Sequence, residues 1–169
     1  MLQVDLRELA RGPCATVGEL PADDPLFTGL GLALARPVVV GGKLQEIGEG
    51  RFYWHGSLDT EVRGECRRCL TAVRLPVAVD IGALFSQDPE TEDDPDTYPL
   101  PRNATLVDVT PAVREELVLA APTFLLCRDD CRGICPRCGK DLNAGPCGCA
   151  PATDSRWQQL TAHKDRFRE

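Results

Sequence analysis

Apolar and polar residues alternate along much of the chain before residue 85, a pattern typical of strands that bury one face. A short strand is predicted at residues 2–6, where Leu2, Val4 and Leu6 share a face. Residues 11–35 are punctuated by proline and glycine, and we expect them to form turns and irregular segments.

Three longer strands are predicted between Pro37 and Gly82. The first covers residues 38–47 and is interrupted at Gly41-Gly42 in the manner of a bulge. After a turn at residues 48–50, the second strand alternates between an apolar face and a polar face. The apolar face carries Phe52, Trp54, Leu58 and Val62, and the other face carries Tyr53, His55, Asp59 and Glu61.

The third strand is the most regular, and the three strands together predict an antiparallel β-meander. Its apolar face carries Val73, Leu75, Val77, Val79 and Ile81. Pro76 on its polar face favours an edge position or a bulge. Residues 65–70 lie between the second and third strands, so Cys66 and Cys69 are expected at the tip of a hairpin.

A helix is predicted after a short strand at residues 106–109. Thr110 is expected to cap this helix and Pro111 to occupy its first position. Pro122 should end it, and a last helix should begin at residue 154 or 155 and bury Trp157 and Leu160. The apolar stripe of the first helix is expected to contain Val113, Leu117, Ala120 and Ala121.

Eight of the nine cysteines form four close pairs: Cys66/Cys69, Cys127/Cys131, Cys135/Cys138 and Cys147/Cys149. Structural zinc has four tetrahedral ligands, commonly from two such pairs. One zinc site, here called the module site, is expected from Cys135, Cys138, Cys147 and Cys149. A second, the hairpin site, is expected from Cys66, Cys69, Cys127 and Cys131. The chain would then bind one or two zinc ions, with Cys14 left over as a small buried residue.

Two other cysteine chemistries are compatible with parts of this spacing. The spacing of Cys131, Cys135 and Cys138 also matches radical S-adenosylmethionine clusters, but that chemistry needs a large α/β barrel. Thiolates can hold iron as well, so an iron–sulfur or redox role stays an alternative. No nucleophile elbow or phosphate loop occurs, and His55 is interpreted as a surface strand residue. We therefore expect no enzymatic activity.

Charge is distributed unevenly over the 169 residues, whose net charge is −7. Six carboxylates without a basic residue fall within 86–97, which predicts a solvated acidic loop. Asp5 and Glu8 stand where a signal peptide needs apolar residues, and no apolar run approaches the roughly 20 residues of a membrane span. A cytoplasmic protein without membrane association is expected, and a reducing compartment favours metal binding over disulfides.

These elements predict an α+β fold, an antiparallel β-meander with a helix and a C-terminal Cys-rich zinc-binding module. Residues 1–126 would form a mainly-β α+β domain that includes the acidic loop. Residues 127–169 would form the Cys-rich module and the last helix, either separately or integrated into one domain with the rest.

Several motifs occur in an order that resembles one bacterial and plastid family. They are Cys66-Arg-Arg-Cys69-Leu70, Leu106-Val-Asp-Val109-Thr-Pro, Cys131-Arg-Gly-Ile-Cys135-Pro-Arg-Cys138-Gly-Lys-Asp-Leu-Asn143, Cys147-Gly-Cys149 and Asp154-Ser-Arg156-Trp157. Together they are similar to the YceD-like family of large ribosomal RNA subunit accumulation proteins, over residues 35–160. The resemblance implies a non-enzymatic factor in ribosome biogenesis, with no small-molecule substrate. It also implies that the downstream metal module is a stabilising elaboration, because some members lack those cysteines.

The expected partner is a ribosomal RNA precursor or a large-subunit assembly intermediate, reached directly or through a protein. Contact is expected through four arginines near the cysteines: Arg67, Arg68, Arg132 and Arg137. Two other classes stay open, a protein-interaction adaptor that never touches RNA and a thiol-based sensor of zinc or oxidant. The Cys66/Cys69 pair would act either as a clip or as part of the contact surface.

Overall fold

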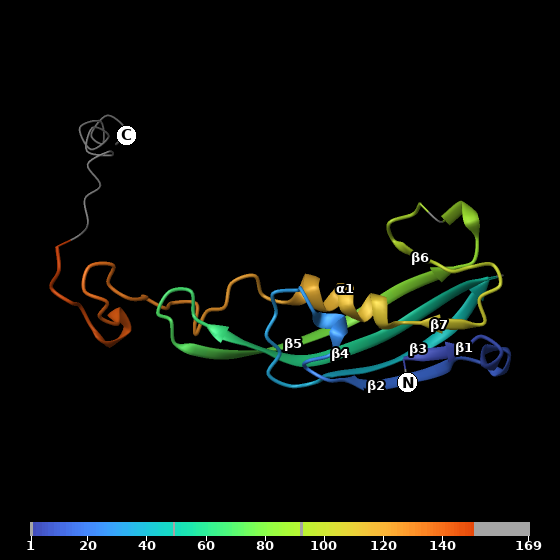
Figure 1. Ribbon diagram of the computed structural model, residues 1–169, viewed down its shortest axis with the longest axis horizontal. Coiled ribbons are helices and arrows are strands. Elements are labelled where there is room, and N and C mark those ends of the chain that lie inside the picture. The colour runs from blue at the N-terminus through green and yellow to red at the C-terminus, as the bar shows by residue number, and fades with distance from the viewer. Residues whose placement is uncertain (1, 49, 92, 151–169) are drawn as a thin grey trace, which may run out of the picture.

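A five-stranded sheet with strand order β2-β3-β4-β5-β6 forms the body of the molecule. The computed structural model describes residues 2–48, 50–91 and 93–150. The sheet strands are β2 (Cys14–Leu20), β3 (Val38–Gly48), β4 (Arg51–Glu65), β5 (Ala72–Ser86) and β6 (Thr97–Pro99). Consecutive strands from β2 to β5 pair antiparallel, and β6 adds a short parallel edge (Figure 1). The predicted α+β fold with an antiparallel meander and a helix is confirmed.

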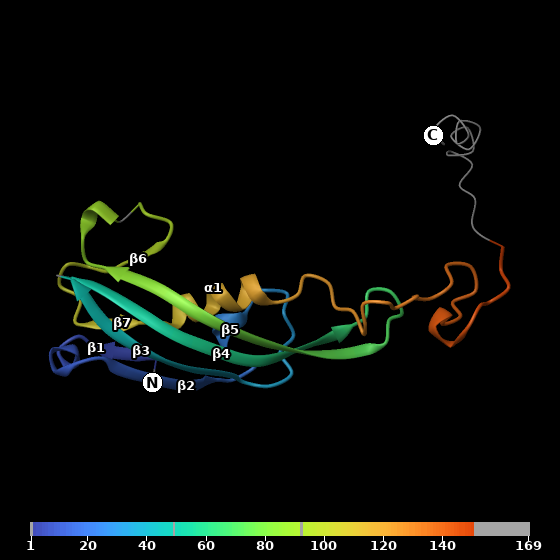
Figure 2. The ribbon, with the colours of Figure 1, turned by 180° about the vertical axis from the view of Figure 1, so that it is seen from behind.

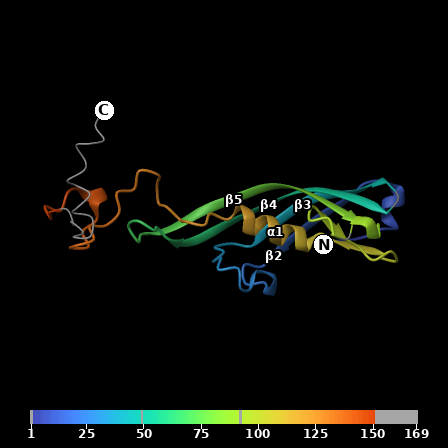
Figure 3. The ribbon, with the colours of Figure 1, turned by 90° about the horizontal axis from the view of Figure 1, so that it is seen from above.

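One face of this sheet is buried beneath α1 (Thr110–Ala120) and a small second sheet. The second sheet pairs β1 (Gln3–Asp5) with β7 (Leu106–Asp108). Val4, Val107 and Leu117 from these elements belong to one apolar core with Trp54 and Ile81 of the large sheet. Helix α1 packs against β5 on this side of the sheet (Figure 3). Short 3-10 turns complete the described elements: η1 (Glu8–Arg11), η2 (Pro25–Phe27), η3 (Pro89–Thr91) and η4 (Leu142–Ala144).

Trp54 organises the centre of the buried face. Its indole is fully buried, and its Nε1 donates to Oγ1 of Thr16 on β2 at 2.8 Å. To reach β2 from β4 it passes over Gly42 and Gly56, where a Cβ would lie within 2.7 Å of the indole. Thr16, Gly42 and Gly56 are paired in register across the three strands. The glycines therefore make room for the ring.

The structure corrects two predictions for the first half of the chain. Residues 14–20 form strand β2 rather than irregular turns. The sequence did not reveal this strand because Thr16, which is polar, occupies a buried position and accepts the indole hydrogen bond, so apolar and polar residues do not alternate clearly. The register of β3 with β4 runs unbroken through Gly41-Gly42, and the irregularity falls between Glu46 and Gly48 instead. The edge position predicted for Pro76 is confirmed. On the side of β5 away from β4, the strand β6 pairs only with residues 84–86, so Pro76 has a strand partner on one side alone among the described residues.

Helix α1 ends just before Pro122 as predicted, but it differs from its prediction at the N-terminus and in its apolar stripe. Thr110 is the first helical residue rather than the cap, and Oδ1 of Asp108 accepts from the Thr110 N–H at 2.9 Å. The buried stripe of the helix contains Ala112, Val113 and Leu117. Ala120, which was expected in this stripe, is exposed in the last turn. The predicted last helix with Trp157 and Leu160 lies outside the described residues. No helix in the described ranges is both long and apolar enough to cross a membrane.

The molecule is elongated, and eight of the nine cysteines lie at one end, here called the cysteine end, whereas Cys14 lies in β2. The β4–β5 hairpin extends beyond α1 and meets the segment after residue 126 at its tip (Figures 1 and 2). The acidic segment around η3 lies at the opposite end of the long axis. The predicted boundary between residues 126 and 127 stays a prediction.

Candidate metal centres

Two groups of four thiols assemble at the cysteine end, and each group places its sulfur atoms within 4.8 Å of one another. Their members are the residues of the hairpin site, Cys66, Cys69, Cys127 and Cys131, and of the module site, Cys135, Cys138, Cys147 and Cys149. The spacing of the cysteines therefore predicted which thiols come together, across about sixty residues of chain in the hairpin site.

The tip of the β4–β5 hairpin forms a knuckle around Cys66. The Leu70 N–H donates to the Cys66 carbonyl at 2.8 Å, and Leu70 takes a left-handed φ of 61° to close the turn. Burial alone would raise the pKa of Cys66, but backbone N–H groups of Cys127, Cys69 and Arg68 offset it and lower that pKa to about 6. Donors aimed at a sulfur stabilise the thiolate that a metal requires.

The chain after α1 is fastened to this tip by backbone bonds. The Arg67 N–H donates to the Leu125 carbonyl at 2.9 Å, and Gly64 leaves space for the Leu125 side chain. Nη1 of Arg68 donates to the carbonyls of Asp129 and Cys131 at 2.7 and 3.0 Å. These contacts bring Cys127 and Cys131 to the hairpin pair.

Gly133 allows the chain to continue from the hairpin tip into the module. Its φ is +72°, and a Cβ there would lie 2.7 Å from the Arg68 carbonyl oxygen. That same carbonyl accepts from the Ile134 N–H at 3.0 Å. Any side chain at residue 133 would therefore disturb the junction between the two sites.

The module site repeats the knuckle around Cys135. The Gly139 N–H donates to the Cys135 carbonyl at 2.9 Å, and the Cys135 N–H donates to the Lys140 carbonyl at 2.8 Å. The backbone N–H groups of Cys138 and Arg137 lower the pKa of Cys135 to about 6. Nζ of Lys140 donates to the Pro146 carbonyl at 2.9 Å, which holds the return of the loop toward Cys147.

Each group also contains one thiol whose pKa is raised. A hydrogen bond with the Cys131 thiol, and to a smaller extent burial, raise the pKa of Cys127 to about 12. Hydrogen bonds with the Cys138 and Cys147 thiols raise the pKa of Cys149 to about 12. Four crowded thiols therefore cannot all ionise alone, whereas a divalent cation at their centre would stabilise four thiolates.

The sulfur spacing fits a tetrahedral ion. A Zn–S bond of about 2.3 Å implies sulfur atoms about 3.8 Å apart in a tetrahedron. In the hairpin site, Cys66 and Cys131 Sγ lie 3.8 Å apart, and Cys69 and Cys127 Sγ lie 3.6 Å apart. A disulfide needs about 2.05 Å, and all nine cysteines, which lie within the described ranges, are free thiols. Cys14 belongs to neither group and is half-buried.

The four arginines predicted to make contacts lie near these sites but differ in what they do. All four are exposed. Arg68 holds backbone carbonyls of the hairpin site, so part of its guanidinium has a structural task. The guanidinium carbon of Arg67 lies 3.9 Å from the centroid of the exposed Phe124 ring. Arg132 and Arg137 line a hollow of about 430 Å³ beside the module site.

Asn143 contacts a predicted thiol, a role that sequence reasoning missed. Its Nδ2 donates to Cys131 Sγ at 3.5 Å, although Asn143 lies in the loop of the module site. Burial would raise the pKa of Cys131, but the Asn143 amide and the Gly133 N–H more than offset it, so that pKa is lowered. The motif around Asn143 was visible in the sequence, but no spacing rule connects an amide to a thiol twelve residues away.

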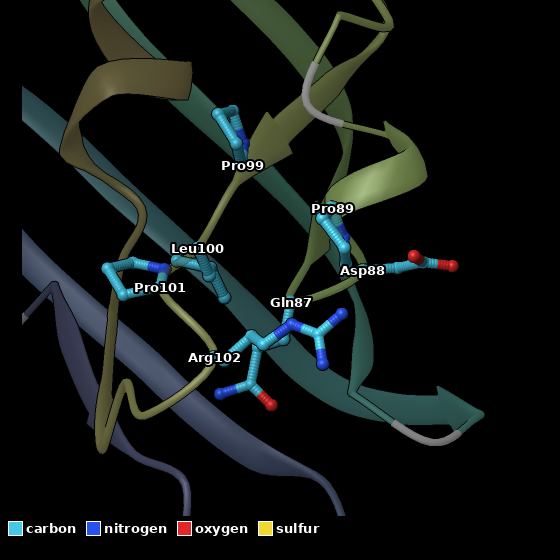
Figure 4. A pocket seen from close by; sticks show the side chains of 7 residues that line it. All are labelled: Gln87, Asp88, Pro89, Pro99, Leu100, Pro101 and Arg102. Carbon is cyan, nitrogen blue, oxygen red and sulfur yellow. The ribbon is translucent and has the colours of Figure 1, made fainter.

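A separate hollow of about 350 Å³ lies at the acidic end of the molecule (Figure 4). It is lined by Gln87, Asp88, Pro89, Pro99, Leu100, Pro101 and Arg102. Nε2 of Gln87 donates to the Ala104 carbonyl at 3.2 Å and holds this loop against the end of β5. In Figure 4 the Asp88 carboxylate points away from the hollow. None of the predicted site residues lines it.

The fold and the thiol groups define a small α+β protein whose β-hairpin carries half of one potential metal centre at its tip. The sequence matches the family model described as large ribosomal RNA subunit accumulation protein YceD over residues 54–163. The chain therefore belongs to this family, as its motifs predicted. Both thiol groups lie within the matched residues.

The similar proteins found by comparison are themselves uncharacterized. Proteins of Mycobacterium tuberculosis and Mycobacterium bovis are each 32% identical over 109 residues, which cover 62% of this chain and 52% of theirs. A Mycobacterium leprae protein is 26% identical over 167 residues, covering 93% of this chain and 75% of its own. The chain thus spans about half the length of the first two relatives. No solved structure matches this one.

Proposed function

We propose that this protein is a non-enzymatic, zinc-binding accessory factor in the accumulation of large-subunit ribosomal RNA. The observation that carries the proposal is the family match over residues 54–163, which contains both groups of four thiols. Family membership supports the role in ribosomal RNA accumulation. The all-sulfur ligand sets support zinc, which thiolates bind readily in tetrahedral sites.

Both proposed zinc ions would have a structural task. Four protein thiolates fill a tetrahedral coordination shell and leave no open position for a substrate. At the hairpin site the ion would clip the chain after Leu125 to the tip between β4 and β5. At the module site it would hold a loop whose described regular structure is limited to the three-residue turn η4 and one β-bridge, between Ile134 and Asp141. Such a loop buries little apolar surface, so metal binding would supply much of its folding free energy.

The cysteine end is the proposed contact surface for the ribosomal RNA precursor. Between residues 63 and 74 there are four arginines and one glutamate, and between residues 127 and 150 four basic and three acidic residues. The opposite end carries the acidic segment, which has five carboxylates among its described residues. RNA phosphates would be attracted to the first end and repelled from the second.

A protein adaptor in the same process is the second candidate. The exposed apolar side chains near the end of α1 favour it, because Leu119 is 72% exposed and Phe124 58% exposed. Apolar groups of this kind are typical of protein contacts. The net charge of −7 also favours a protein partner over extensive RNA contact.

Crosslinking in growing cells, followed by purification of the full chain and sequencing of attached RNA, tests the two candidates. Recovery of large-subunit precursor RNA supports direct contact, and a ribosomal protein or assembly factor without RNA supports the adaptor. Elemental analysis of the same purified protein tests the metal. Two zinc ions per chain are expected, whereas iron with visible absorption would contradict zinc.

A further inference from the structure

Asn143 joins the two candidate metal centres. It lies in η4, in the chain between Cys138 and Cys147 of the module site. Its Nδ2 nevertheless donates to Sγ of Cys131, a thiol of the hairpin site, at 3.5 Å. A residue in the loop of one group of thiols therefore provides a hydrogen bond to a thiol of the other group.

The orientation of the Asn143 amide is fixed at both ends. Its Oδ1 accepts from the Arg132 backbone N–H and from Nη2 of Arg128, each at 2.8 Å. Its Nδ2 donates to Oδ1 of Asp141 at 2.7 Å as well as to Cys131. Turning the amide over would set oxygen against oxygen and nitrogen against donors. The N–H is therefore directed to the sulfur.

The position of η4 depends on the loop that the module site closes. Oδ1 of Asp141 accepts from the Asn143 backbone N–H at 2.9 Å, and the Leu142 N–H donates to the Gly133 carbonyl at 2.9 Å. Ile134 and Asp141 form a β-bridge next to Cys135. An ion bound by the module thiols would fix both ends of the loop from Cys138 to Cys147, and with it Asn143.

We propose that Asn143 is a positioning residue that couples metal loading of the two centres. An ion in the module site orders η4, and the ordered amide then favours the Cys131 thiolate and strengthens binding at the hairpin site. This inference rests on the proposed metal binding. Because such coupling is reciprocal, an ion in the hairpin site must strengthen binding at the module site by the same factor.

The expected size follows from other metal sites. Outer hydrogen-bond partners of ligands typically change metal affinity by about 10- to 100-fold. Since a sulfur accepts hydrogen bonds weakly, the lower figure applies here. The wild-type chain should therefore load both sites nearly together, and a chain without the amide should load them in two separate steps.

Cobalt(II) titration of the full chain against a competing chelator tests the coupling, because thiolate-bound cobalt absorbs visible light. Asn143→Ala should weaken the hairpin site about 10-fold. Asn143→Asp should weaken it at least as much, since it keeps the oxygen that accepts from Arg132 but loses the N–H donor. Asn103→Ala, in an exposed loop, is the matched control and should change nothing.

A double-mutant cycle separates coupling from local damage. Replacing Cys138 and Cys149 by serine removes the module site and should weaken the hairpin site by the same factor as Asn143→Ala, and adding Asn143→Ala should weaken it no further. Two bound ions with unchanged affinities in both Asn143 variants would overturn the coupling and leave metal binding intact. A wild-type chain that binds no ion would overturn both.

Discussion

At the scale of single residues, the cysteines divide into eight that face two common centres and one that does not. Replacing Cys66 by serine should leave one zinc ion per chain, because the module site keeps all four thiols. Cys14→Ser should keep two ions. Elemental analysis of the purified variants with excess zinc checks both. Two ions in the Cys66 variant would contradict the assignment of the hairpin site.

A second residue-scale prediction concerns Asp108, whose carboxylate accepts from the first backbone N–H of α1. Burial would raise its pKa, but hydrogen bonds from Gln3 and Thr110 more than offset this, so the pKa lies below its ordinary 3.8. Because the folded pKa is below the unfolded one, the carboxylate stabilises the fold above about pH 4, and this contribution is lost as the pH falls through and below 3.8.

The substitution Asp108→Asn should therefore lower the free energy of unfolding by roughly 0.3–1 kcal/mol at pH 7, the size of the interaction between a carboxylate and a helix N-terminus, because an amide oxygen can still accept from the Thr110 N–H. It should also reduce the dependence of stability on pH in the acid range. Urea unfolding between about pH 3 and pH 7 measures both effects. Asp80→Asn, on the exposed face of β5, is the control. An unchanged acid slope in the Asp108 variant would contradict the assigned pKa.

At the scale of elements, three strands are held together by the Trp54 ring. An alanine Cβ at residue 56 would lie 2.4 Å from Cζ2 of Trp54, whereas one at residue 41 would meet nothing within 4 Å. Gly56→Ala should therefore destabilise the protein by about 1–3 kcal/mol, the usual cost of overpacking a core. Gly41→Ala should be neutral or slightly stabilising. Thermal unfolding of the two variants compares them directly, and equal melting temperatures would contradict the role of Gly56.

The same elements explain how far the sequence alone could lead. Period-two patterns identified β3, β4 and β5, because each of these strands buries one apolar face. Strand β2 was missed because Thr16, in its middle, is polar and buried to accept the Trp54 hydrogen bond. The bulge expected at Gly41-Gly42 was wrong. Gly42 is needed because a side chain there would collide with the Trp54 indole, and the backbone of the strand continues without a break.

For the candidate site, too, the sequence predicted some features and missed others. Cysteine spacing was enough to predict both groups of thiols, because tetrahedral binding requires pairs that can approach one centre. The contacts around them could not be predicted. Asn143 contacts Cys131 only because the loop folds back onto the hairpin site. The guanidinium of Arg68 donates to two backbone carbonyls, and no pattern in the sequence indicates that contact.

At the scale of the whole molecule, charge is separated along the long axis, and this predicts how RNA would bind. If the cysteine end contacts phosphates directly, Arg67→Glu with Arg137→Glu should weaken binding of a large-subunit precursor fragment. The salt dependence of log K should also become less steep, by about 0.7–0.9 for each lost phosphate contact.

Arg51→Glu, at the opposite end of β4, makes the same type of charge change away from the cysteines and is the matched control. Filter binding at several salt concentrations measures both variants. Because the far end already repels phosphate through its carboxylates, the control should leave the salt slope unchanged. Equal losses in both variants would mean that RNA senses only the net charge, and the adaptor would then be the better account of how this protein acts on ribosomal RNA.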